Sequence, residues 1–156
     1  MALSKTEQVK VISQRLNIPQ GFVNQIITDY TNYVKYELNQ FGFANFLGIV
    51  VIHRKGEAFT INNMRTIASQ CHDISKERGI GFSYIRGVLD HYLDLIVTEL
   101  VSEGKINING FATLKYEGGR TYVVSSWTLP KGHVSATTEW LTSTVNNIAA
   151  SRMIGV

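Results

Sequence analysis

The sequence predicts an α+β fold in which a unit of two helices and a β-hairpin occurs twice. Three observations support this prediction: an internal repeat with an offset of 62 residues, pairs of segments with apolar residues at helical spacing, and strand-like segments that follow a glycine after each pair. Apolar residues make up 44% of the 156 residues, which is enough for a core that needs no disulfide or metal.

The repeat becomes visible when the sequence is aligned with itself at an offset of 62. The identical pairs include Tyr30 with Tyr92, Glu37 with Glu99, Leu38 with Leu100, Gly42 with Gly104, Asn45 with Asn107, Gly48 with Gly110 and Gly56 with Gly118. Two amphipathic helices can align by chance, but the glycines beyond the helices align at the same offset. We therefore expect residues 1–62 to form a truncated first unit and residues 63–156 a second unit with a C-terminal helix.

Each unit is expected to begin with a short helix and a long helix. The short helices are predicted at 6–16 and 64–77, and breaks rich in Gly and Pro follow them. The long helices are predicted at 21–40 and 82–102, and each carries one apolar stripe at steps of three and four residues. A glycine then stands where the end of a helix favours the left-handed conformation.

Strands are expected after each long helix, at 43–53 and 105–116, with hairpin turns at Gly56 and at Gly118-Gly119. The second unit continues with a return strand at 121–129, a turn at 130–132 and a last helix at about 137–152. Thr137 or Thr138 could cap this helix. Its predicted core face comprises Trp140, Leu141, Val145, Ile148 and Ala149.

Residues 101–114 resemble a signature of the HU/IHF family of bacterial histone-like DNA-binding proteins. Gly104 matches the glycine that ends the long helix, and Gly110-Phe111-Ala112-Thr113-Leu114 matches the Gly-Phe-Gly-Thr-Phe hallmark with two replacements. The resemblance extends over residues 6–129 as two units and is more degenerate in the first. It implies a helical base under small antiparallel sheets, with pairing of units through the base. The two units could pair within one chain or with units of other chains.

The chain departs from the family where HU-type proteins bind DNA. Their long arms are rich in Arg and Lys and carry a proline at the tip that inserts between base pairs. The first unit has only His53-Arg54-Lys55-Gly56-Glu57 at this point and the second only Glu117-Gly118-Gly119-Arg120, both without proline. The net charge is +3 with a pI of about 9.0, and the basic residues are dispersed. The family's DNA-bending role therefore does not transfer to these residues.

We therefore expect a non-enzymatic structural or assembly protein that uses HU/IHF-like folds for protein–protein contacts. Arm-less HU/IHF-like proteins occur among structural proteins of tailed, crAss-like phages, so the resemblance implies a component of a virion neck or tail ring, located in the phage virion or the host cytoplasm. Its partners would be other proteins or copies of itself, including a ring, and Trp127 is the predicted partner contact. The N-terminus lacks the apolar core of a signal peptide, and no apolar run has the ~18 residues of a membrane span.

The alternative is an architectural DNA-binding protein that contacts phosphates without reading bases. The residues predicted for this role are Arg54, Lys55, Lys115, Arg120 and Lys131. A salt-dependent affinity would distinguish it from an assembly protein.

Catalytic, cofactor and metal sites are not expected, and neither is a small-molecule substrate. His91 lies beside Asp90 and near Asp94, which could indicate metal binding or acid–base chemistry, but a solvated helix face is the favoured interpretation. Cys71, the only cysteine, is interpreted as a small buried residue rather than a nucleophile. The Gly79-Ile80-Gly81 segment lacks the third glycine and the preceding strand of a phosphate-binding loop, which favours a simple helix break.

Overall fold

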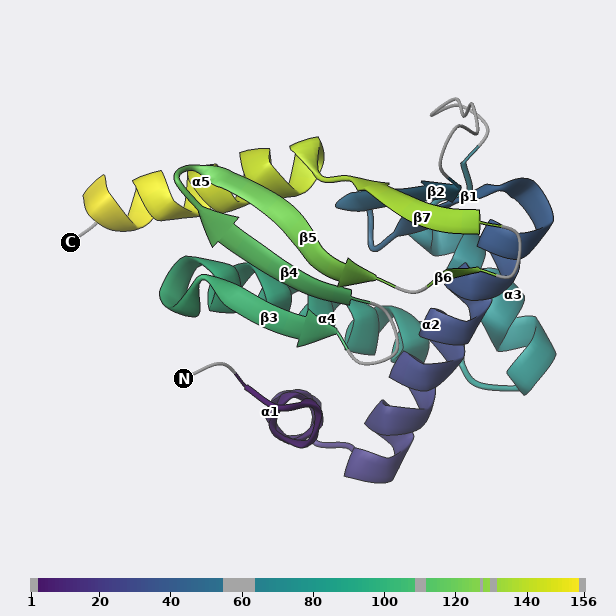
Figure 1. Ribbon diagram of the computed structural model, residues 1–156. Coiled ribbons are helices and arrows are strands. Elements are labelled where there is room, and N and C mark those ends of the chain that lie inside the picture. Colours follow the sequence, from purple (N-terminus) through teal and green to yellow (C-terminus); the bar gives the residue numbers. More distant parts are fainter. Residues whose placement is uncertain (1–2, 55–63, 109–111, 127, 130–131, 155–156) are drawn as a thin grey trace.

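The computed structural model describes residues 3–54, 64–108, 112–126, 128–129 and 132–154, and this part of the chain has an α+β fold (Figure 1). The first unit contains α1 (Lys5–Leu16), α2 (Gln20–Phe41), β1 (Phe43–Phe46) and β2 (Val50–Arg54). The second unit contains α3 (Ile67–Arg78), α4 (Phe82–Glu103), β3 (Lys105–Ile108), β4 (Ala112–Glu117) and β5 (Arg120–Ser126). The chain then forms β6 (Thr128–Leu129), β7 (Gly132–Thr137) and α5 (Glu139–Ile154).

The predicted repeat is confirmed, element by element. The bounds of α1 and α3, of α2 and α4, and of β1 and β3 differ by the same 62 residues at both ends. The helix ends also repeat, because the Ser4 and Thr66 side chains both accept an N–H bond at the first turn. Asn17 and Gly79 both end their short helices with positive φ, at 54° and 70°, a conformation that Gly and Asn tolerate best.

Each expected strand segment is an antiparallel hairpin rather than one strand. Phe43 pairs with His53 and Phe46 with Val50, and in the second unit Lys105 pairs with Lys115 and Ile108 with Ala112. The first hairpin turns at Leu47 and Gly48, both with positive φ. The predicted turn at Gly118-Gly119 joins β4 to β5, whereas the one predicted at Gly56 lies outside the described residues.

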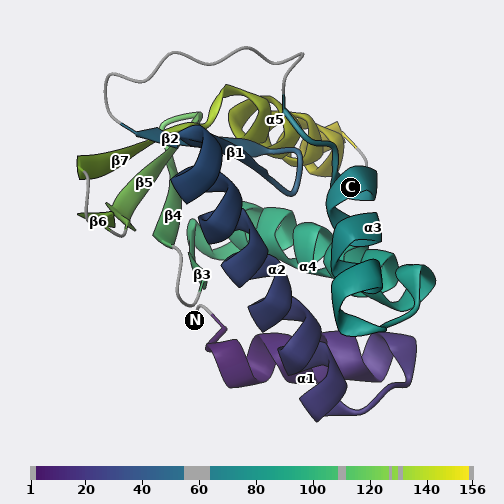
Figure 2. The same cartoon turned by 90° about the vertical axis from the view of Figure 1, so that its right-hand side faces the viewer.

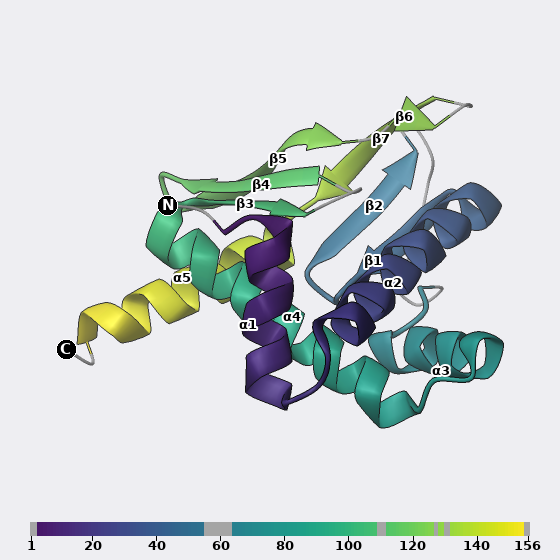
Figure 3. The same ribbon diagram turned by 90° about the horizontal axis from the view of Figure 1, so that it is seen from below.

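The helices α1 to α4 form a common base on one side of the sheets, with α1 packed across α4 and α3 packed against both α2 and α4 (Figures 2 and 3). The predicted apolar stripes of α2 and α4 belong to one buried cluster, which includes Ile26, Val34, Val88 and Ile96. Because the stripes bury each other, the two units pair within this chain, one of the two arrangements that the sequence leaves open.

An approximate twofold axis relates the two units. Phe22 and Tyr84, which are equivalent at the 62-residue offset, contact each other edge to face with ring centroids 5.5 Å apart. Gln8 Nε2 donates to the Asn107 carbonyl at 3.0 Å, and its equivalent Gln70 Nε2 donates to the Asn45 carbonyl at 2.9 Å. In an isologous interface, equivalent residues meet each other at the twofold axis, and every contact from the first unit to the second recurs from the second to the first. The chain is thus an intramolecular pseudo-dimer, and these contacts also cover the edges of β1 and β3.

The region after β5 differs from the prediction. The structure has the additional strand β7, which pairs antiparallel with β2, with Val51 opposite Thr137 and Arg54 opposite Val134. The sheets therefore have the strand orders β1-β2-β7-β6 and β3-β4-β5. The prediction of a turn leading directly into the last helix was wrong here, because strand formation at 132–137 depends on pairing with a distant edge rather than on local pattern.

The predicted C-terminal helix is confirmed as α5, which packs on α4 and β5. Leu141 and Val145 are fully buried in the common core, as expected. Trp140 is 40% exposed, so its assignment to the core was wrong. It stands one residue before Leu141 and so points away from the face that meets α4 and β5. In the described part of the chain, no helix is both long and apolar enough to cross a bilayer.

Candidate functional site

The residues predicted to contact phosphate do not form one cluster. Arg54 ends β2, Lys115 lies in β4 and Arg120 begins β5, whereas Lys55, Lys131 and the predicted partner contact Trp127 lie outside the described residues. The end of β2 and the β4–β5 turn lie at opposite ends of the molecule (Figures 1 and 3). Whether these residues bind phosphate stays a prediction.

Arg54 has a role inside the fold. Its guanidinium Nη2 donates to the Asn39 carbonyl in the last turn of α2, where the helix leaves carbonyls without intrahelical partners. Its backbone N–H donates to the Gly42 carbonyl at 2.9 Å, a bond that recurs between Tyr116 and Gly104 in the second unit. Arg54 therefore stabilises the junction between α2 and the first hairpin.

The outer face of the β3–β4–β5 sheet carries a basic row that includes one residue missed by the sequence analysis. Lys105 is exposed and lies directly opposite Lys115, and Lys115 lies opposite the exposed Tyr122. Like charges at opposite positions of neighbouring strands repel each other. The sequence contained both lysines, but only the strand register places them side by side.

The side chains considered for catalysis are occupied or buried. Asp90 pairs with Arg86 and Asp94 pairs with Arg15, both at 3.0 Å, so the carboxylates beside His91 already have cationic partners. Cys71 is completely buried as predicted, and burial raises the pKa of its thiol to about 11. Among the residues that the structure describes, no group of three His, Cys, Asp or Glu side chains could hold a metal ion.

A buried polar network joins α2, β1 and α3. The Gln70 amide is fully buried, with Nε2 donating to Glu37 Oε1 at 2.7 Å and Oε1 accepting from the Tyr30 hydroxyl at 2.8 Å. The Tyr30 oxygen in turn accepts the Leu47 backbone N–H at 2.9 Å. Burial raises the pKa of Glu37, and the Gln70 hydrogen bond opposes that shift. Because each member has a partner, the network fixes the packing of the two units.

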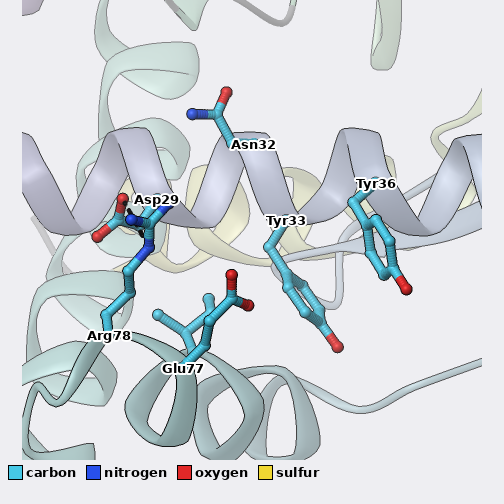
Figure 4. A pocket seen from close by; sticks show the side chains of 7 residues that line it. Asp29, Asn32, Tyr33, Tyr36, Glu77 and Arg78 are labelled. Atoms are coloured by element: carbon cyan, nitrogen blue, oxygen red, sulfur yellow. Dashed lines mark ion pairs between the residues drawn. The ribbon is translucent and has the colours of Figure 1, made fainter.

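A groove with a mixed polar and apolar lining lies between α2 and α3. It has a volume of about 390 Å³ and is lined by Asp29, Asn32, Tyr33, Tyr36, Ile74, Glu77 and Arg78 (Figure 4). This groove was not predicted from the sequence. The spacing of Asp29, Asn32, Tyr33 and Tyr36 by three or four residues places them along one side of α2, which was the available signal.

At the Tyr33 side of the groove, the tyrosine is held in place by the ion pair between Asp73 and Arg65. The Tyr33 hydroxyl donates to Asp73 Oδ2 at 2.5 Å, and the Arg65 guanidinium also bonds to this carboxylate oxygen. Burial is the largest cause that raises the pKa of the Tyr33 hydroxyl, and the Asp73 hydrogen bond adds to it. Tyr33 is therefore a neutral, oriented donor at neutral pH.

Comparisons with known proteins leave the fold without a named relative. No protein-family model, no curated protein and no solved structure matches this chain. The structure itself shows two helix–helix–hairpin units joined in one α+β body.

Proposed function

We propose that this chain is a non-enzymatic structural protein whose two HU/IHF-like units act in protein–protein assembly, with a phage virion neck or tail ring as the setting. The observation that carries the proposal is the pairing of the two units through their own helices. A single HU-type unit has to find a second subunit for this face, whereas here the face is already covered. Further contacts would therefore use the outside of the pseudo-dimer.

Exposed apolar side chains support outward contacts. Among the described residues, the large hydrophobic side chains with more than a third of their surface exposed are Tyr36, Phe41, Tyr84, Tyr122, Val124 and Trp140. Tyr122 and Val124 are both exposed on β5 of the second sheet, Val124 at the β-bulge opposite Thr113 and Leu114. Aromatic residues on exposed faces are typical of protein interfaces, because they bury much area with few rotatable bonds.

The alternative proposal is non-specific DNA binding, and the Lys105–Lys115 row favours it. Two lysines in register on an open sheet face could neutralise neighbouring phosphates. Against it stands the internal use of Arg54 at the end of α2. In addition, the β4–β5 hairpin turns immediately at Gly118-Gly119 and extends no arm from its sheet.

One pair of measurements tests both proposals. We expect light scattering after size-exclusion chromatography to give a mass of several chains, and the double variant Tyr122→Ser/Val124→Ser to lower that mass. Lys10→Ser, another exposed substitution, is the matched control and should leave the mass unchanged. A monomer that binds duplex DNA tightly at about 150 mM salt, and loses binding in Lys105→Gln/Lys115→Gln, would instead support the alternative.

A further inference from the structure

We propose that the groove between α2 and α3 binds the guanidinium group of an arginine side chain presented by a partner protein. The inference rests on the proposed assembly function and specifies the chemistry of one contact. Its evidence is an unsatisfied buried carboxylate, the lining of the groove, and the equivalent position in the second unit.

The first observation is the carboxylate of Asp29, whose side chain is only 3% exposed. Its Oδ1 accepts from Gln25 Nε2 at 2.8 Å and lies 3.6 Å from Arg78 Nε. Its Oδ2 is buried and has no hydrogen-bond partner among the described residues. A buried carboxylate oxygen without a donor is costly, so a ligand that supplies N–H groups here would gain a bond that the free protein lacks.

The second observation is the lining of the groove. Figure 4 shows the Glu77 carboxylate and the Tyr33 and Tyr36 rings on the same side, between α2 and α3. The carboxylates of Asp29 and Glu77 outnumber the single guanidinium of Arg78, which favours a cationic guest. The ring centroids of Tyr33 and Tyr36 lie 6.1 Å apart, and their faces can contact a planar guanidinium.

Arg78 is the side chain that has to move for this binding. It is 51% exposed and is held to Asp29 by a contact of 3.6 Å, longer than a hydrogen bond. An exposed arginine exchanges rotamers readily, so it can turn toward solvent and leave Asp29 to the incoming group. Glu77, which is exposed at the rim, would then pair with the guest.

The third observation comes from the equivalent position between α4 and α1. At the 62-residue offset Asn32 corresponds to Asp94, and Glu77 corresponds to Arg15. There the Arg15 guanidinium of the first short helix bonds to Asp94 Oδ2 of the second long helix at 3.0 Å. In the other half of the molecule, the equivalent pair of helices thus already holds an arginine. In the α2–α3 groove the short helix has Glu77 at this position instead of an arginine. An arginine therefore has to come from another protein.

The test is an NMR titration of the full chain with three short peptides that differ only at one central residue: arginine, lysine or citrulline, the neutral isostere of arginine. We expect saturable shifts of the amides of residues 29–36 and 77–78 with the arginine peptide, and at least about fivefold weaker binding of the citrulline peptide. Asp29→Asn and Glu77→Gln should each weaken arginine binding several-fold. Asp94→Asn, the same kind of change at the position equivalent to Asn32 in the other half, should leave it unchanged.

Several outcomes would overturn the inference: no saturable shift up to about 10 mM peptide, equal binding of the citrulline peptide, or tighter binding of the free polyamine spermidine than of the arginine peptide. Because Glu77 is exposed, its variant keeps the test valid if Asp29→Asn fails to fold. The light-scattering mass is measured separately. Arginine binding by a chain that does not assemble would count against the proposed function alone, and assembly without arginine binding would count against this inference alone.

Discussion

Glu37 shows at the scale of a single residue how the two units are joined. Its carboxylate lies in α2 and is 3% exposed, it accepts from Gln70 of α3, and the Arg65 guanidinium lies 3.8 Å away. Burial raises its pKa in the folded protein. A raised carboxyl pKa means that the folded state binds the proton more tightly than the unfolded chain does.

This shift predicts a pH-dependent effect of Glu37→Gln. The contribution of the native glutamate to stability is fully present below its ordinary pKa and is lost as the pH rises through its raised folded pKa. A neutral glutamine can still accept from Gln70 and pays no charge penalty. We therefore expect urea unfolding to show the variant gaining stability relative to the native protein between pH 4 and pH 8. Glu139→Gln, at an exposed position, should show no such gain. A constant difference across this range would contradict the prediction.

Residues differ in how well the sequence predicts their burial, backbone conformation and hydrogen-bond partners. The burial of Cys71 and the left-handed Gly42 and Gly104 follow from local pattern, and they are confirmed. The partners of Gln70 could not be predicted, because Glu37 and Tyr30 reach it from a helix more than 30 residues earlier in the chain. The groove at Asp29 was missed for the same reason, since three of its seven lining residues belong to α3.

Among the elements, α5 closes the core over α4 and β5. Thr121 and Thr142 share a hydrogen bond of 2.6 Å, and the Tyr116 hydroxyl donates to Asn146 Oδ1 at 2.6 Å. These bonds anchor the helix to the β4–β5 hairpin beside the buried side chains of Leu141 and Val145. The helix therefore belongs to the folded body and is not an appendage.

Two neighbouring substitutions in α5 should have very different effects. Leu141→Ala removes a fully buried side chain and should lower the free energy of unfolding by about 2–5 kcal/mol. Trp140→Ala truncates a larger side chain that is 40% exposed, and should cost less than about 1.5 kcal/mol. Denaturant unfolding followed by circular dichroism measures both. A greater loss for Trp140→Ala would mean that its ring is packed and that the core has been assigned to the wrong face.

The four helices of the repeat were predicted to within a few residues because their signals are local. Apolar spacing marks all four helices, Ser4 and Thr66 cap the short ones, and Gly42 and Gly104 end the long ones, each signal lying within its own segment. The strand β7 carries no comparable signal, and its existence depends on the unpaired side of β2. Pairing between strands that are distant in the sequence cannot be predicted from the pattern of each segment alone.

At the scale of the whole molecule, neither unit is complete without the other. The sheet of the first unit obtains β7 from the C-terminal region, and α1 packs against α4 of the second unit. The sequence predicted two units whose apolar helix faces must pack against a partner. It could not decide whether that partner lies in the same chain or in another one. It also could not show that Arg54 lies at the opposite end of the molecule from Arg120. The domain boundary at residue 62 stays a prediction.

Separate expression of residues 1–62 and 63–156 tests this interdependence. We expect residues 1–62 alone to lack a dispersed amide NMR spectrum, because Val23, Ile26 and Val34 would lose the helix that covers them. When the two fragments are produced together, they should copurify and regain the circular dichroism spectrum of the intact chain. A well-dispersed spectrum from residues 1–62 alone would show that the first unit folds independently.

The pairing of β7 with β2 has a consequence for the order of events during synthesis. Val51 finds its partner Thr137 only after 86 further residues have been added to the chain. One edge of the first hairpin therefore stays unpaired until β7 has been synthesised. Such delayed closure slows folding and exposes the nascent chain to mispairing with its neighbours. Completion of the first sheet thus depends on a strand that is synthesised after the entire second hairpin, although β1 and β2 are encoded early in the chain.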